Sequence, residues 1–318
     1  MALKKTSAIQ KKSDNDFIQP FLIDHTSIRG RLVRVSKVLD DILHAHNYPV
    51  AVSVNLAEQI VIASLLAATL EEGGIITVQA KGDGPVRFII VDIMAGGIIR
   101  GYADVNEEDL KKIIGKSRKK QSIAKILGQG YFAVTLDPGG EGQRYQGVVE
   151  LKGDTISDTF KGYFNQSQQG DIELHVAVRA PTKTNKNWLA AGIIIERMPV
   201  LGGTGIPITL ADQDDVWDRS RIFINTLQDE ELLDEDITPN ALLYRLFNED
   251  GVRVFTLQPL KAGCRCSRER VEMVLKSVSK EELLESLDEN DQISVHCQFC
   301  NKREKFTRAN INKLFKKA

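Results

Sequence analysis

The four cysteines of this 318-residue chain are the residues best suited to chemistry, and all of them lie in its last 55 residues. They form two close pairs, Cys264-Arg-Cys266 and Cys297-Gln-Phe-Cys300, with thirty residues between the pairs. This spacing is typical of a tetrahedral zinc site in which thiolate sulfurs fill all four coordination positions. The same thiols could also close into two local disulfides. The sequence therefore leaves open whether the zinc is permanently structural or is expelled by an oxidant.

Four thiolates around one Zn2+ leave no open coordination position for a substrate, which argues against hydrolytic metal catalysis. We predict one zinc ion per chain, held by Cys264, Cys266, Cys297 and Cys300. His296 adjoins Cys297, but a complete sulfur shell leaves this histidine no role as a ligand. The first pair is Cys-x-Cys rather than the commoner Cys-x-x-Cys, and each pair is able to form its own disulfide once the metal has left.

Short folded elements are predicted on both sides of each cysteine pair. Ser267 is a suitable N-cap for a helix that runs to Val278. The N–H groups and dipole of this helix, together with the neighbouring arginines, are expected to hold Cys266 as a thiolate. The other elements expected here are a strand over 293–296, a turn at the second cysteine pair, a strand over 303–306, and a helix that starts at a capping box of Ser279 with Glu282 and ends at Leu287.

The first 210 residues predict one α+β domain, because hairpins outnumber βαβ crossings and so favour an antiparallel sheet. The run from Leu56 to Leu70 is apolar almost all round, which predicts a core helix that ends near Gly73. Ile28 to Val35 alternates apolar and polar residues, as a half-buried strand does. Further strands are expected over 17–22, 75–80, 86–93, 98–105, 131–136, 144–151, 172–178 and 189–197, and helices over 36–46, 107–119 and 157–167.

The composition changes between Ala211 and Asp250, where twelve acidic residues accompany three arginines. Apolar residues persist there at helical spacing, which predicts a pair of amphipathic helices broken near Pro239. Excess like charge weakens isolated helices, so these are expected to need a neighbour to stay folded. An ordinary packed helical linker is the alternative. The predicted divisions are a disordered tail over 1–16, an α+β core over 17–210, an acidic helical linker over 211–251 and a zinc-binding domain over 252–318.

Composition and motifs bear on the class of function. The net charge of −1 argues against non-specific electrostatic binding of nucleic acid by the protein as a whole. Seven basic residues against one acid after Cys300 nevertheless keep a zinc-ribbon nucleic-acid binder as the alternative. The chain shows no nucleotide-binding loop and no convincing nucleophile and base, which predicts a protein without enzymatic activity. A disulfide oxidoreductase using Cys297 and Cys300 is disfavoured, because the pair follows a strand rather than opening a helix.

The predicted surroundings of the protein follow from two further features. No window approaches 18 uncharged apolar residues, so we expect no transmembrane helix. The Lys-rich N-terminus has no apolar region of the kind found in export signals, which favours the reducing cytosol. In that compartment, clustered cysteines are more often metal ligands or redox centres than permanent disulfides.

Several short runs across the chain add to the cysteine motifs. They are Ile28-Arg-Gly30, Tyr48-Pro49, Ala63-Ser-Leu-Leu-Ala-Ala-Thr-Leu70, Gln79-Ala-Lys-Gly-Asp-Gly-Pro85, Arg144-Tyr-Gln-Gly-Val-Val-Glu-Leu151, Tyr163-Phe-Asn-Gln-Ser167, Ala190-Ala-Gly192 and Met198-Pro199. Together with both cysteine pairs at their separation, these runs make the chain similar, over nearly its whole length, to the redox-regulated holdase chaperones of the thirty-three kilodalton heat shock protein family. One departure is Gln168, where the family usually has Glu.

The resemblance implies a switch. Reduced protein would hold zinc through the four cysteines and be largely inactive. Oxidant together with heat or another unfolding stress would form the disulfides Cys264–Cys266 and Cys297–Cys300 and release zinc. The linker would then lose structure, and the protein would bind unfolding clients without ATP. Family members form homodimers when active and pass clients to an ATP-dependent foldase system. The sequence does not reveal the client-binding surface; the candidates are Phe223, Leu227, Leu243 and Phe247, and the apolar core surface that they cover.

Overall fold

The computed structural model describes residues 15–67, 70–115, 120–140, 142–166, 170–198 and 210–315. Most of the predicted tail, and Gln168, lie outside these residues. Asp16, which the prediction placed in a disordered tail, has a defined position. Its carboxylate accepts hydrogen bonds from the backbone N–H groups of Ser36 and Val38, both at 3.0 Å. It thereby caps helix α1 (Lys37–Leu43) from a distant part of the chain.

Two six-stranded sheets form the core, and the first has the strand order β10-β1-β2-β9-β8, with β11 also paired to β1. Each pairing in this sheet, which we call sheet A, is antiparallel. The predicted strands are therefore confirmed, and two short strands from beyond the linker are added to them. The strands are β1 (Phe17–Ile23), β2 (Ile28–Val35), β8 (Ile172–Arg179), β9 (Leu189–Arg197), β10 (Val252–Val254) and β11 (Gln258–Pro259).

The second sheet, sheet B, has the order β12-β5-β4-β3-β6-β7. Its pairings are antiparallel except for the short parallel pairing of β12 with β5. The antiparallel α+β core predicted from the hairpins is confirmed. The strands are β3 (Ile75–Gly82), β4 (Val86–Met94), β5 (Ile98–Val105), β6 (Gly130–Asp137), β7 (Tyr145–Glu150) and β12 (Lys261–Ala262).

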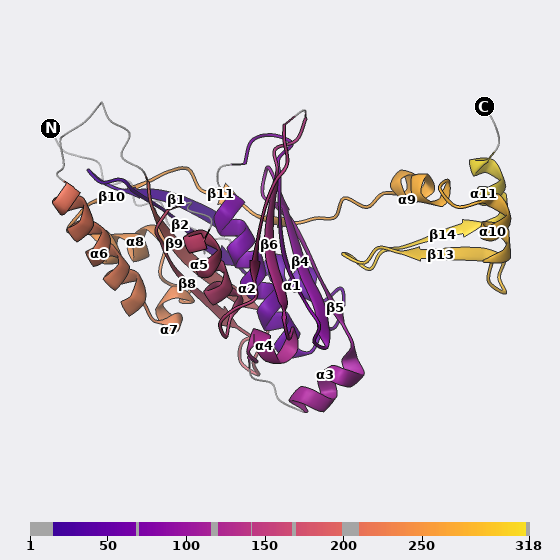
Figure 1. The fold of residues 1–318 in the computed structure, drawn as a ribbon, viewed down its shortest axis with the longest axis horizontal. Helices are drawn as coiled ribbons and strands as arrows, with labels where there is room; N and C mark the ends of the chain where they lie inside the picture. Colours follow the sequence, from indigo (N-terminus) through magenta and orange to yellow (C-terminus); the bar gives the residue numbers. More distant parts are fainter. Residues whose placement is uncertain are drawn as a thin grey trace.

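Helix α2 (Val50–Leu66) lies between the two sheets and contacts strands of both (Figure 1). It is buried on every side from Ala51 to Leu65, as expected of a helix that is apolar nearly all round. Its predicted bounds were wrong at both ends, because it begins at Val50 and ends at Leu66. Polar residues such as Asn55 interrupt the apolar run, but Asn55 Nδ2 donates to the Ala51 carbonyl at 2.8 Å, inside the helix.

Three further core helices surround the sheets: α3 (Glu107–Ile114), α4 (Ile123–Ile126) and α5 (Ile156–Gln166). The helix predicted over 107–119 ends earlier than expected, at Ile114. Gly115 follows with a φ of 58°, a conformation that ends α3. The short α4 was not predicted. Among the described residues, none of the helices is both long enough and apolar enough for a membrane span.

The acidic linker contains three helices rather than two: α6 (Leu210–Thr226), α7 (Asp229–Leu232) and α8 (Pro239–Phe247). Pro239 does not break a helix but begins α8, because the first helical residue needs no N–H partner. Thr238 caps this helix by accepting a hydrogen bond from Ala241 N at 3.2 Å. The three helices cover the face of sheet A that is turned away from α2 (Figure 1).

The covered face, which we call the outer face of sheet A, is apolar and closely packed by the linker. One of its large side chains is Phe21, whose ring centroid is 5.7 Å from that of Phe247 on α8. A Cβ at Gly30 would lie 2.1 Å from the Phe21 ring, so glycine is required there for this ring to lie flat on the sheet. The buried residues of this cluster from sheet A are Phe17, Phe21, Ile23, Ile28, Leu32, Ala177, Leu189, Ala191, Ile193 and Ile195.

Strand β2 is therefore not half-buried, as its alternation predicted, but buried on both faces. Its arginines are accommodated by partners from other elements. Arg31 pairs with Glu196 at 2.5 Å on the α2 side of the sheet. Arg34 lies on the outer face and donates to the carbonyl oxygens of Leu232 and Ile237 in the linker, both at 3.2 Å. The prediction failed because Arg31 is covered by α2 and Glu196, and Arg34 by the linker, rather than by water.

Residues predicted as one zinc-binding domain over 252–318 are divided in the structure. Strands β10, β11 and β12 pair with the core sheets, and the C-terminal unit, residues 263–315, follows them. Its elements are α9 (Arg268–Leu275), α10 (Lys280–Glu285), β13 (Gln292–His296), β14 (Arg303–Thr307) and the unpredicted α11 (Arg308–Leu314). Its buried apolar cluster holds only Leu275, Leu283, Phe306 and Ile311.

Candidate metal centre

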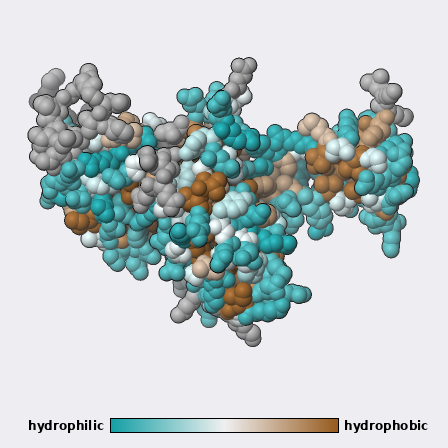
Figure 2. Space-filling model, viewed as in Figure 1, coloured by the Kyte–Doolittle hydropathy of each residue, from teal (hydrophilic) through white to brown (hydrophobic). Residues whose placement is uncertain are grey.

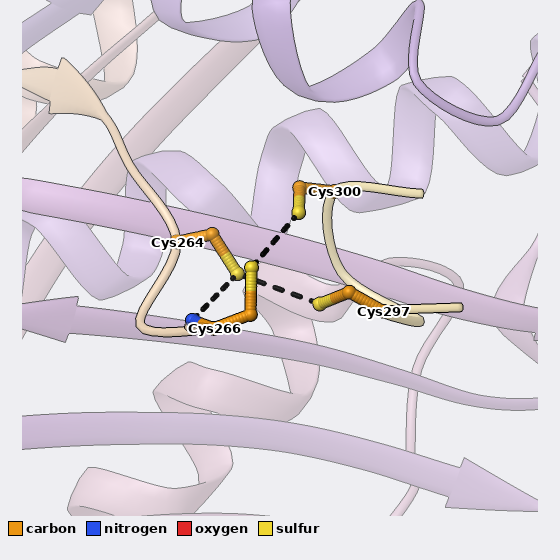
Figure 3. Close-up of side chains that lie close together, drawn as sticks. All are labelled: Cys264, Cys266, Cys297 and Cys300. Carbon is orange, nitrogen blue, oxygen red and sulfur yellow. Dashed lines mark hydrogen bonds between the residues drawn. The ribbon is translucent and has the colours of Figure 1, made fainter. Parts of the chain in front are cut away.

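The four cysteines come together between the core and the C-terminal unit. Cys264 and Cys266 lie on the loop between β12 and α9, and Cys297 and Cys300 lie on the turn between β13 and β14. Their sulfur atoms point toward one another from the two segments (Figure 3). The predicted cluster is therefore confirmed as a juxtaposition of four thiols from two loops that are distant in sequence.

The distances between the sulfur atoms fit a single metal ion. Cys264 Sγ is 3.5 Å from Cys297 Sγ, and Cys266 Sγ is 3.4 Å from Cys300 Sγ. All four sulfurs lie within 4.8 Å of one another. In a tetrahedron with Zn–S bonds of about 2.3 Å, neighbouring sulfurs are about 3.8 Å apart. The four cysteines are free thiols and are positioned to bind a metal ion.

Local structure holds each loop in this conformation. Ser267 caps α9, as predicted, by accepting a hydrogen bond from Arg270 N at 3.3 Å. The second loop is closed by hydrogen bonds from Cys297 N to the Lys302 carbonyl at 2.9 Å and from Asn301 N to the Cys297 carbonyl at 2.8 Å. Asn301 has a φ of 56°, a conformation that asparagine tolerates better than most residues. The first loop is thus held by a side-chain cap and the second by backbone hydrogen bonds, both beside the cysteines.

The thiols of the cluster differ in their pKa values. Burial acts to raise the pKa of Cys264, but hydrogen bonds from Cys266 N–H and from the other thiols outweigh it and lower this pKa to about 7. Burial and hydrogen bonding to the other three thiols both raise the pKa of Cys266. The thiolate form is therefore favoured at Cys264 rather than at Cys266, where it was predicted, because the N–H of Cys266 donates to the Cys264 sulfur at 3.5 Å.

The affinity for metal is expected to fall steeply as the pH is lowered. Zinc binds thiolates, so metal binding must displace the protons of Cys266 and Cys300, whose pKa values are both raised. Each displaced proton changes the apparent affinity about tenfold per pH unit, so two protons predict at least a ~100-fold loss from pH 8 to pH 7. Below the Cys264 pKa of about 7 a third proton competes and the loss steepens. Chelator competition across pH 6 to 8 measures this slope, and a flat profile would contradict thiolate ligation.

The other predicted site residues lie elsewhere. His296 is exposed at the end of β13 and is not part of the sulfur cluster. The client-binding candidates are on the linker, where Leu227, Leu243 and Phe247 are buried against the outer face of sheet A and Phe223 is partly buried beside them. The structure therefore separates the metal centre from the candidate client surface.

One residue of the site was missed by the sequence reasoning. Phe299, inside the second cysteine pair, contacts Arg100 and Tyr102 on β5 rather than its own unit. A signal was present, because a large aromatic side chain in a four-residue turn has no local core to pack into.

Comparison with known proteins places the chain in a family. The family model described as Hsp33 protein matches residues 16–307. The chain belongs to the Hsp33 family. Among its relatives in this family, the 33 kDa chaperonin of Caulobacter vibrioides is 36% identical over 289 residues, which cover 91% of this chain and 93% of that protein. The 33 kDa chaperonin of Vibrio parahaemolyticus is 34% identical over 304 residues, covering 96% and 97% of the two chains.

A solved Hsp33 structure shows the same fold. The crystal structure of the 33 kDa chaperonin from Thermotoga maritima superposes with a TM-score of 0.73 at 22% sequence identity. The match covers 94% of this chain and 97% of that one. The resemblance noted from the sequence is confirmed, and the family assignment supports a chaperone function for this Hsp33 protein.

Proposed function

We propose that this Hsp33 protein is a redox-regulated, ATP-independent holdase that binds unfolding proteins under oxidative and heat stress. The observation that carries the proposal is the apolar outer face of sheet A, which in the described part of the chain is covered by the acidic linker helices. A holdase needs apolar surface that is hidden at rest and available under stress. The linker lies between the core and the cysteine cluster in sequence, where a change at the cysteines could reach it.

The docked linker hides the apolar outer face of sheet A. Figure 2 shows a face that is largely hydrophilic, with small separate hydrophobic patches. One patch lies over the C-terminal unit near α9, where Met273 and Val274 are exposed. By contrast, Leu243 and Phe247 of the linker are fully buried against sheet A. Departure of the linker would uncover both the linker residues and the outer face beneath them.

The redox chemistry proposed for the cluster is disulfide formation within each pair, Cys264–Cys266 and Cys297–Cys300. For each pair, two thiolates give two electrons to one peroxide molecule, which takes up two protons and leaves as two molecules of water. Bound zinc would supply a closed tetrahedral link between the two loops while the thiolates are reduced. Conversion of the four thiolates into two disulfides removes the donors that hold this link.

Loss of the link would unfold the C-terminal unit. Structural zinc contributes about 10–16 kcal/mol to the folding of small zinc domains. The unit has four buried apolar residues in its cluster, which is too small a core for a domain of this length. The segment from Cys264 back to the linker is held by short strands, and β12 pairs through Lys261 and Ala262 alone. We propose that fraying of these strands passes the change to α8.

The proposal extends to partners and location. We propose that the clients are unfolding proteins, that the oxidised protein forms a homodimer, and that clients pass to ATP-dependent foldases in the cytoplasm. No catalytic turnover is proposed. Two of the basic residues behind the nucleic-acid alternative are paired within the C-terminal unit, Lys302 with Glu304 at 2.8 Å and Arg308 with Asp291 at 2.8 Å, which weakens that alternative.

The test measures zinc content and suppression of client aggregation on one sample, first reduced and then after peroxide with mild heating. The expected result is one zinc lost per chain in step with a gain of holding activity. Reduction with thiol and added zinc should reverse both. Equal suppression of aggregation before and after zinc loss would refute redox regulation, and zinc loss without any holding activity would refute the holdase function itself.

A further inference from the structure

Phe299 is the side chain through which the metal-binding turn contacts the core. Its ring lies under the Arg100 guanidinium, with 3.9 Å between the arginine Cζ and the ring centroid. The ring centroid of Tyr102 is 6.2 Å away. The carbonyl oxygen of Phe299 accepts a hydrogen bond from His46 Nε2 at 3.0 Å. The turn that carries two of the four thiols therefore contacts both β5 and the loop after α1.

The receiving surface on the core is itself held in place. Arg100 Nε donates to Asp92 at 2.8 Å, and Asp92 is buried. The His46 ring stacks on Tyr48 with 5.1 Å between centroids, and the Tyr48 hydroxyl accepts a hydrogen bond from Ala103 N at 3.0 Å. The cation and the rings that meet Phe299 are thus fixed by the core fold, and a contact to a fixed surface restrains the turn that makes it.

Both cysteine loops are tied to the core beside their thiols. Asn301 Nδ2, next to Cys300, donates to the Ala45 carbonyl at 3.1 Å. Gly263 N, next to Cys264, donates to the Ile99 carbonyl at 2.8 Å. A cavity of about 210 Å³ lies between these attachments and is lined by Cys264, Phe299 and Cys300 among others. The cysteine cluster is therefore part of an interface between the core and the C-terminal unit.

We propose that Phe299 is a positioning residue that anchors the metal-binding turn to the core and slows the loss of metal from the reduced cluster. A closed four-sulfur shell gives up its metal only after one sulfur has moved away. Movement of Cys297 or Cys300 requires the turn between them to open, and Phe299 lies within that turn. Its contacts with Arg100 and His46 must break first, so the core sets the rate at which the shell opens.

The anchor also gives the core a direct contact with the redox-active turn, a consequence that rests on the proposed function. A disulfide between Cys297 and Cys300 closes a ring that contains Phe299, and the turn must rearrange for the two sulfurs to bond. The contacts of Phe299 with Arg100 and Tyr102 are then lost. Undocking of the C-terminal unit would follow from the bond itself, before any unfolding of that unit.

The test is the rate at which zinc passes from the reduced full-length protein to a chromogenic chelator in excess. Phe299→Ala is expected to release zinc about tenfold faster than the parent chain, because a cation–π contact and the packing of a ring are removed. The matched control is Gln298→Ala, because Gln298 occupies the same turn but is exposed. The control is expected to release zinc at the parent rate. Hydrogen exchange at the Gly263 amide should be faster in Phe299→Ala only.

A second variant, placed in the core, separates loss of the contact from a folding defect in the turn itself. His46→Ala leaves the whole C-terminal unit unchanged and removes the hydrogen bond to Phe299, so about threefold faster release is expected. Release from both variants at the control rate would overturn the proposal, and if Phe299→Ala is isolated without zinc, the rate for His46→Ala decides alone. The assay contains neither oxidant nor client, so its result does not depend on the holdase function.

Discussion

Replacing Cys297 with serine is expected to lower the zinc affinity of the reduced protein by at least about 100-fold, because a serine hydroxyl does not replace a thiolate ligand. The sulfur of Cys297 lies 3.5 Å from that of Cys264, so its loss removes a bridge between the two loops. The buried apolar cluster of the C-terminal unit is too small to compensate for the metal. The unit should therefore be partly unfolded even in reducing buffer.

Chelator competition measures the affinity of Cys297→Ser, and the dispersion of amide signals in NMR spectra measures the folding of the unit. His296→Ala is the matched control, because this neighbour is exposed and lies outside the cluster. An unchanged zinc affinity in Cys297→Ser would count against a four-sulfur shell. If the metal centre controls the linker, the variant should also hold clients without oxidant.

Replacing Phe247 with alanine is expected to release the linker from the outer face of sheet A in the reduced, zinc-bound protein. Phe247 is fully buried and packs on Phe21 and Phe223. Truncation of a buried phenylalanine costs about 3–5 kcal/mol. Phe247 belongs to the cluster between the linker and sheet A and not to the core cluster around α2, so this loss should fall on the docking of the linker rather than on the core. We expect holding activity without oxidant, together with full zinc content.

The emission of Trp217 on α6, which is buried in the same cluster, should shift to longer wavelength in Phe247→Ala. Replacing Trp188 with phenylalanine in all samples leaves Trp217 as the one tryptophan. Tyr244→Ala is the matched control, because Tyr244 lies on the same helix and is 64% exposed. Suppression of aggregation no greater than in this control would contradict the role of the linker as a cover. Loss of activity after oxidation would instead identify Phe247 as a client contact.

The sequence was sufficient for features that depend on near neighbours along the chain. Hairpins such as β3–β4 are marked by the turn Gly82-Asp-Gly-Pro85 and by the alternation around it. The N-cap at Ser267 and the pairing of β13 with β14 are local in the same sense. The cysteine cluster was predictable although it is not local, because metal ligation restricts the residue types and spacings that can form a site.

Features that depend on distant partners were not predictable. Strands β11 and β12 contain two residues each, which is too short for any periodicity to show. The burial of Arg34 depends on the linker carbonyls of Leu232 and Ile237, which are 198 and 203 positions away along the chain. The contact of Phe299 with β5 likewise depends on how the C-terminal unit sits against the core, which no local pattern specifies.

The enclosure of α2 between the two sheets means that the core surface on which the linker docks can stay folded when the linker itself unfolds. The buried members of the cluster around α2 come from residues between Ile18 and Ile194, with Leu260 as the single later one, and the C-terminal unit contributes none among the described residues. In the proposed cycle, the core thus keeps its shape while the linker and the C-terminal unit unfold. Once the thiols are reduced, the linker returns to an intact surface and competes there with bound client. Recovery then requires the refolding of two small segments rather than of the whole chain.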